Sequence, residues 1–263
     1  MPFIPFHDDH PTRRTPLVTY ALVAVNVLVF LWMSRLPELQ QQVLAYQHGF
    51  VPARVRQLSQ HEPILVPINV AIVDPYWGEQ IEPRAIELPA DPRQIWLSLV
   101  TCMFLHGSWM HLLGNMWFLW LFGNSVEDRL GPLGYLFLYL VGGLIASGAH
   151  WKMDPTSTVP IIGASGAIAA VLGAYAVTWP WARVSTLVFL VIFVTIIDVP
   201  ALVVLGVWFV AQLLAGQQSL HAAGSGGVAW WAHVGGFLAG MVLMPLLSAL
   251  VGNAKTEDRM TTD

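Results

Sequence analysis

Long apolar runs, separated by polar connections, dominate the chain. A helix needs about 20 residues to cross the hydrocarbon core of a bilayer, and six apolar windows come close to that length. They cover residues 17–34, 109–126, 132–150, 161–179, 199–216 and 228–251. The pattern predicts an all-α, polytopic membrane protein with six transmembrane helices. A long first loop, polar and rich in proline, is expected over about 35–107.

One apolar segment does not fit this series. VSTLVFLVIFVTII, residues 184–197, has 14 residues and is followed by Asp198 and Pro200. An apolar run of that length is more often re-entrant, interfacial or buried than spanning. We therefore expect residues 184–197 not to cross the membrane. A seventh crossing would reverse the orientation of the last helix.

Lysine and arginine in the short connections predict the orientation of the helices. With six crossings, one side has six basic residues and the short connections of the other side have only Lys152. The prediction is a cytoplasmic N-terminal segment at 1–16, a membrane domain at 17–251 and a cytoplasmic tail at 252–263. The six basic residues are Arg13, Arg14, Arg129, Arg183, Lys255 and Arg259.

Composition supports a membrane protein. Hydrophobic residues make up 56% and charged residues 11%, against about 25% charged in soluble domains, and the mean hydropathy is +0.60. The net charge of -4 comes without a basic stripe, so no nucleic-acid partner is expected. A single cysteine, Cys102, excludes an intrachain disulfide. The first 16 residues lack the pattern of an organelle transit peptide, which favours a prokaryotic plasma membrane.

Strongly polar residues begin the second, fourth and sixth predicted helices, which run in the same direction. HLLGN supplies His111 and Asn115, whose spacing places them on one helix face; GASG supplies Ser165, and AHVGG supplies His233. Polar groups inside a membrane are costly and usually face the protein interior or a wet cavity. We expect these four residues to form one layer near the outer surface.

Each polar residue also has a purely structural explanation. Ser165 between Gly163 and Gly166 is typical of close helix packing. His233 can be an interhelical hydrogen-bonding residue, and His111 can form a polar clasp with the neighbouring amide. Residue type alone leaves both explanations open.

Small residues predict which helices approach closely. Gly236 and Gly240 form a G-x-x-x-G pattern, and Ala169 and Gly173 have the same spacing in the fourth predicted helix. Such faces let helix backbones come together. Close packing of the fourth and sixth helices would bring the serine and the histidine within hydrogen-bonding reach.

That arrangement is suited to acyl transfer. A serine hydroxyl is a weak nucleophile until a base takes its proton, and a histidine such as His233 suits that role. Asn115, His111 and the free N–H groups that start the fourth helix are candidate donors to an oxyanion. No acid stands in the layer to orient His233, so Ser165 and His233 are predicted to act as a dyad rather than a triad.

Four motifs, TCMFLHGSWMHLLGNM, VEDRLG, GASGA and AHVGGFLAG, occur in this order and resemble the rhomboid intramembrane serine proteases. The resemblance covers about residues 95–250 and the first predicted helix. It implies Ser165 as nucleophile, His233 as general base, and His111 and Asn115 as oxyanion support.

The same resemblance implies structural roles for other residues. Glu127, Arg129 and Gly131 match a motif at the cytoplasmic end of the second helix, and Gly163 and Gly166 flank the nucleophile. A six-helix core and a first loop lying partly in the outer leaflet of the lipid bilayer are implied. The implied partners are transmembrane protein substrates cut near the outer surface, and no metal or cofactor is implied.

The sequence departs from this family in two places. Some relatives have an aromatic residue one turn after the nucleophile, where this chain has Ala169. Trp208, Trp230 or Trp231 would then pack against His233. The first loop also has an apparent insertion around 73–92.

The sequence gives less support to other classes of function. His61–Glu62 is followed by PIL, so the H-E-x-x-H motif of a zinc protease fails. An aspartyl protease needs two acids in its helices, and only Asp198 lies near one. A channel or transporter lacks support from internal repeats or charged rings. The main alternative is a non-catalytic rhomboid-like protein that binds membrane spans for folding, trafficking or degradation.

Overall fold

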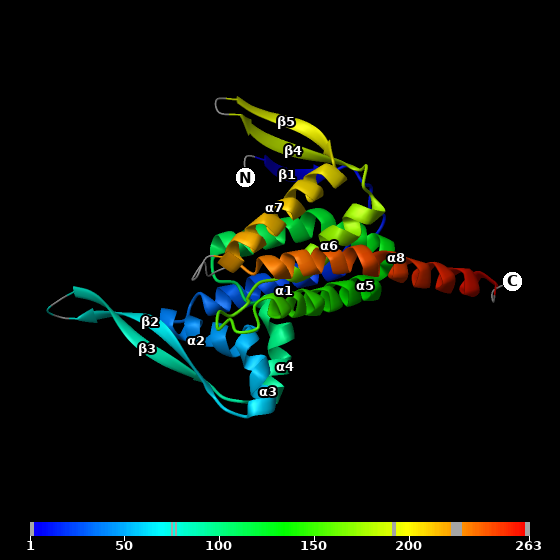
Figure 1. Ribbon diagram of the computed structural model, residues 1–263. Helices are drawn as coiled ribbons and strands as arrows, with labels where there is room; N and C mark the ends of the chain where they lie inside the picture. Colours follow the sequence, from blue (N-terminus) through cyan, green and yellow to red (C-terminus); the bar gives the residue numbers. More distant parts are fainter. Residues whose placement is uncertain (1–2, 75, 77, 191–192, 222–227, 261–263) are drawn as a thin grey trace.

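The computed structural model describes residues 3–74, 76, 78–190, 193–221 and 228–260. Its centre is a bundle of apolar helices in which α5 (Trp109–Met153), α6 (Ser165–Thr178) and α8 (Trp230–Met260) pack against one another. Helix α1 (Leu17–Met33) packs against α5, and α7 (Ala201–His221) packs against α8. Two antiparallel sheets lie at opposite sides of this bundle (Figure 1).

The apolar helices coincide with the six predicted segments. They are α1 (Leu17–Met33), α5 (Trp109–Met153), α6 (Ser165–Thr178), α7 (Ala201–His221) and α8 (Trp230–Met260). Among the described residues, three helical stretches are long and apolar enough to cross a membrane, namely Trp109–Met153, Ala201–Ser219 and Trp230–Val251. The chain is therefore a membrane protein. The two other apolar helices, α1 and α6, are shorter, and the number of six crossings stays a prediction.

Helix α5 contains two of the predicted segments, joined at a break. Gly131 has φ 75° and ψ 169° there, a conformation that glycine adopts readily, and Pro132 follows it. A Cβ atom on Gly123 would lie 2.5 Å from the hydroxyl of Tyr135. In a straight helix these two positions would be about 18 Å apart. The halves 109–130 and 132–153 therefore fold back on each other.

Helix α6 is the centre of the core. Every residue from Ala167 to Ala176 is buried, as expected of a helix that is apolar on all sides. Glycines in α8 bring the two backbones together, because a Cβ on Gly236 would overlap the carbonyl oxygen of Gly166 and one on Gly240 that of Ala170. This contact fixes the start of α6 relative to the start of α8.

The chain is mostly helical, as predicted, but the prediction of an all-α fold holds only in part, because the described residues also contain five strands. β1 (Phe3–Asp8), β4 (Arg183–Leu190) and β5 (Phe193–Pro200) form an antiparallel sheet in the order β1-β4-β5. Of the predicted non-spanning segment 184–197, residues 184–190 and 193–197 lie in the paired strands β4 and β5, not in a helix, and residues 191–192 lie outside the described part of the chain. Their valine, isoleucine and threonine content favours extended structure, which a count of apolar residues does not reveal.

Residues 35–107, predicted as a loop, are largely folded. They contain α2 (Glu38–His48), η1 (Pro52–Arg56), α3 (Gln57–Gln60), β2 (Ile64–Asp74), β3 (Gly78–Leu88), α4 (Pro92–Thr101) and η2 (Cys102–Phe104). Within the apparent insertion, residues 73–74 end β2 and residues 78–88 form β3, and the two strands make a hairpin that projects from the bundle (Figure 1). One face of the hairpin, including Val66 and Ile86, packs against Leu39 and Val43 of α2.

The predicted terminal segments also take part in the fold. Strand β1 binds the bundle, since the Trp117 indole N–H donates to the carbonyl of Pro5 at 2.7 Å and the Tyr175 hydroxyl donates to the Asp8 carboxylate at 2.8 Å. Burial raises the pKa of Asp8, although the hydrogen bonds from Tyr175 and Ser125 oppose the change. At the other end α8 continues through Met260 into the predicted tail; residues 261–263 lie outside the described part of the chain.

Candidate active site

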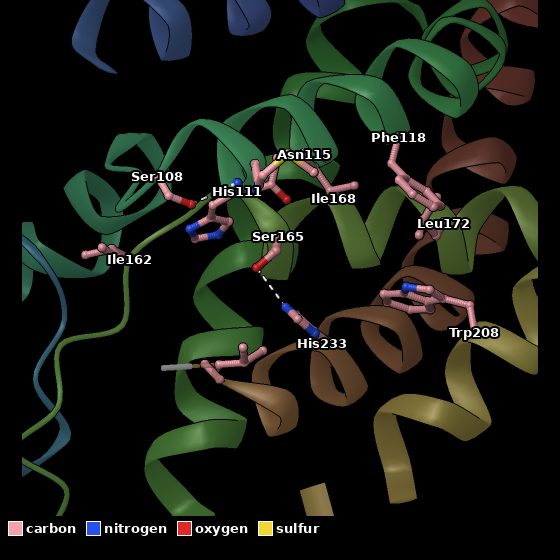
Figure 2. A pocket seen from close by; sticks show the side chains of 14 residues that line it. Ser108, His111, Asn115, Phe118, Ile162, Ser165, Ile168, Leu172, Trp208 and His233 are labelled. Atoms are coloured by element: carbon pink, nitrogen blue, oxygen red, sulfur yellow. Dashed lines mark hydrogen bonds between the residues drawn. The ribbon is translucent and has the colours of Figure 1, made fainter. Parts of the chain in front are cut away.

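Ser165 and His233 face each other where α6 and α8 begin. Ser165 Oγ lies 2.8 Å from His233 Nε2, and Figure 2 shows the two side chains pointing toward one another. His233 is buried. The glycine contacts between α6 and α8 make this approach possible, because Gly236 lies one turn after the histidine and contacts the backbone beside the serine.

The second nitrogen of the His233 ring has a partner that the sequence interpretation missed. Nδ1 lies 2.7 Å from Oε1 of Gln212, in α7. An amide oxygen only accepts, so Nδ1 carries the hydrogen and Nε2 is left to accept from the Ser165 hydroxyl. The available signal was a single amide side chain inside the apolar run VVLGVWFVAQLLAG.

Asn115 and His111 project from α5 toward the same space (Figure 2). Asn115 Nδ2 donates to Nε2 of His106 at 2.9 Å, a second residue that the sequence interpretation missed although it lies in the same motif. His106 is buried; burial, with a smaller effect of His111, lowers its pKa to about 4. This neutral ring can accept from Asn115, which keeps its other amide hydrogen for a second acceptor.

The backbone before α6 leaves room for these side chains. Gly163 has φ +118°, and a Cβ there would lie 2.5 Å from His111 Nε2 and 3.5 Å from Asn115 Nδ2. Its N–H donates to the Cys102 carbonyl at 2.9 Å, which fixes the turn. Ala164, the residue before α6, provides no side-chain cap. The first N–H groups of α6 therefore remain available as donors at the positive end of the helix dipole.

A cavity of about 560 Å³ lies beside Ser165. It is polar near the serine and apolar toward Phe118, Leu172 and Trp208, which Figure 2 shows grouped together. Its lining consists of Ser108, Met110, His111, Gly114, Asn115, Phe118, Ile162, Ser165, Ile168, Leu172, Trp208, Val228, Ala229 and His233. Such a cavity can accept a peptide carbonyl next to apolar side chains.

Two tryptophans lie beside the ring of His233. The ring centroids of Trp208 and Trp230 each lie 6.0 Å from that of His233, tilted by 35° and 89°. Ala169 is fully buried and lies against Gly236, 3.2 Å from where a Cβ would be. The departure at Ala169 therefore allows closer packing of α6 on α8.

The two charged residues of the predicted motif at the end of the second helix, Glu127 and Arg129, lie in different surroundings. The Glu127 carboxylate accepts from the backbone N–H groups of Val18 and Thr19 and from the Thr19 hydroxyl, each at 2.8 Å. Glu127 thus caps the start of α1, and its negative charge interacts favourably with the positive end of the helix dipole. Arg129 is exposed.

Within the described residues, no group of three or more histidine, cysteine, aspartate or glutamate side chains could hold a metal ion.

A family model described as the Rhomboid domain matches residues 92–250, more than half of the chain. Rhomboid-like protein 11, chloroplastic, of Arabidopsis thaliana is 32% identical over 177 residues, which cover 62% of this chain and 56% of the relative. Presenilin-associated rhomboid-like protein A, mitochondrial, of Danio rerio is 34% identical over 148 residues, 55% of this chain and 36% of the relative.

Rhomboid protein 1, mitochondrial, of Saccharomyces cerevisiae is 31% identical over 156 residues, 56% of this chain and 40% of the relative. The matched part thus spans less than two thirds of each of these relatives. The family match covers the helices that carry the serine, the histidine and their buried partners. The chain belongs to the rhomboid family.

Proposed function

We propose that this protein is an intramembrane serine endopeptidase, which cleaves transmembrane proteins near the outer membrane face with a Ser165–His233 dyad. The observation that carries the proposal is the 2.8 Å contact between Ser165 Oγ and His233 Nε2. Membership of the rhomboid family adds support. A serine used only for helix packing does not need an imidazole nitrogen as acceptor.

The proposed reaction begins with attack of Ser165 Oγ on the carbonyl carbon of the scissile peptide bond. The hydroxyl proton passes to His233 Nε2, and the carbonyl oxygen becomes an oxyanion. His233 then gives that proton to the nitrogen of the leaving amine as the C–N bond breaks. Water attacks the acyl-enzyme with His233 again as base, which releases the second product and restores the serine.

Three kinds of donor are available to the oxyanion. Asn115 has an amide hydrogen beyond the one given to His106, His111 lines the same cavity, and the first turn of α6 has free N–H groups. One such donor is typically worth about 10²–10³ in rate. The apolar end of the cavity would hold side chains next to the cleaved bond.

Location and topology are parts of the same proposal. We place six helices across a plasma membrane, both termini in the cytoplasm and the dyad near the opposite face. A reporter fused after Asp263 tests this arrangement. Finding that reporter outside the cell would require an odd number of crossings.

Cleavage can be tested with purified protein and a panel of single-span proteins in proteoliposomes. Ser165→Ala and His233→Ala should each abolish cleavage while insertion and thermal stability are kept. Ser185→Ala, at a half-buried serine in β4 whose hydroxyl donates to Asp198, is the matched control and should cleave normally.

A fluorophosphonate probe gives a second measurement that needs no substrate. The wild type and Ser185→Ala should be labelled, and Ser165→Ala should not. Near-normal cleavage by Ser165→Ala would refute the mechanism. Absent labelling together with co-purified single-span proteins would favour the non-catalytic alternative.

A further inference from the structure

Gln212 holds His233 from the side opposite Ser165. Its Oε1 lies 2.7 Å from His233 Nδ1, and its Nε2 donates to the Trp208 carbonyl at 3.3 Å. The side chain is 4% exposed. Reversing the amide would set its oxygen against the Trp208 carbonyl oxygen, so this contact favours the orientation that turns Oε1 toward the ring.

We propose that Gln212 is a positioning residue, which selects the His233 tautomer and orients the ring toward Ser165. The proposal rests on the serine protease function above. Neutral histidine carries one ring hydrogen, and Gln212 accepts it at Nδ1. The lone pair at Nε2 then faces the nucleophile, the arrangement a general base requires.

An amide can do this throughout the reaction without taking a proton. After proton transfer both nitrogens of His233 carry hydrogens, and Oε1 continues to accept from Nδ1. The proton on Nε2 is the one that goes to the leaving amine. A neutral acceptor also avoids placing a second ionised group among apolar helices, where an unpaired charge is costly.

One turn of α7 provides two contacts to the same ring. Gln212 binds its edge, and Trp208, four residues earlier, supports its face at a centroid distance of 6.0 Å. The titratable groups that act electrostatically on His233 are His111 and His150, both in α5. Ser165 is the partner from α6. Within the described residues no carboxylate is hydrogen-bonded to the ring, so the amide has the role an acid has in a triad.

Cleavage kinetics of three variants test this role. Gln212→Leu removes the acceptor at similar size and should lower kcat about 10- to 100-fold, the effect of leaving a buried N–H unsatisfied, with KM nearly unchanged. Gln212→Glu keeps an acceptor and should restore most of kcat. Its carboxylate favours the protonated ring, so the acid limb of the pH–rate profile should move to higher pH. Gln217→Leu, at an exposed position on α7, is the matched control.

The inference is overturned if Gln212→Leu cleaves as fast as Gln217→Leu, or if Gln212→Glu is no better than Gln212→Leu. A loss confined to KM would point to a role in substrate binding and would also overturn it.

Nitrogen NMR of ring-labelled histidine tests the same contact without proteolysis, with His233→Ala used for assignment. Wild type should show His233 protonated at Nδ1, and Gln212→Leu should gain the Nε2-protonated form. Wild type protonated at Nε2 would refute the inference even in an active enzyme. If Ser165-dependent cleavage is absent but the tautomer depends on Gln212, the proposed function fails and the positioning role stands.

Discussion

Replacing Gly163 with alanine tests how the site is built. Its φ of +118° is one that L residues rarely adopt, and such strain costs about 1–3 kcal/mol. The new methyl group would also lie 2.5 Å from His111 Nε2, and overpacking a core typically costs a further 1–3 kcal/mol. We expect Gly163→Ala to lower the free energy of unfolding by about 2–4 kcal/mol, since the two costs partly relax together.

Activity should fall further than stability explains. Relief of the contact moves His111 or the turn before Ser165, and a displaced oxyanion donor costs about 10²–10³ in rate. The assay is cleavage of a single-span substrate at a temperature where thermal unfolding shows the variant folded. Gly206→Ala is the control, because no heavy atom lies within 4 Å of that Cβ; alanine in a helix is about 0.5–1 kcal/mol better than glycine. Wild-type cleavage and stability in Gly163→Ala would refute the reasoning.

Three further predictions concern separate parts of the structure. Asn115→Ala should reduce cleavage about 10²–10³-fold while fluorophosphonate labelling persists; unchanged cleavage would exclude Asn115 as a donor. Gly240→Ala should lower the free energy of unfolding by about 1–3 kcal/mol, because its methyl group would overlap a carbonyl of α6, and stability equal to Gly206→Ala would contradict that close contact. Burial raises the pKa of Asp8, so its contribution to stability is complete below the ordinary carboxyl pKa and is lost as pH rises through the raised one. Asp8→Asn should remove that part of the pH dependence of thermal unfolding, and an identical slope in both proteins would be evidence against it.

Helical structure was predictable where the apolar run was long and ended at residues that break a helix. The segment that became α6 is one case, and Gly131 with Pro132 separated the two halves of α5. Residues 184–197 were harder, because a short apolar run fits a strand or a buried helix equally. The pairing of β4 with β1 joins residues more than 170 positions apart, and no local pattern reports such a contact.

The candidate site was predictable as far as residue type and helix direction allow. Ser165 and His233 were expected to meet because small residues at regular spacing predict close helices. Gln212 was missed because a lone amide in an apolar helix has many roles, and its partner depends on how α7 is rotated. His106 was missed because it lies before α5, outside the helical spacing that relates His111 and Asn115.

The cap that Glu127 provides has a consequence for anyone who trims this protein. Residues 92–250 contain the family match, yet the three donors to this carboxylate come from Val18 and Thr19. A fragment starting at residue 92 would leave Glu127, which is 3% exposed, without those donors. Each unsatisfied buried group would lower the free energy of unfolding by about 1–3 kcal/mol or more. A fragment that keeps these hydrogen bonds must therefore include the start of α1.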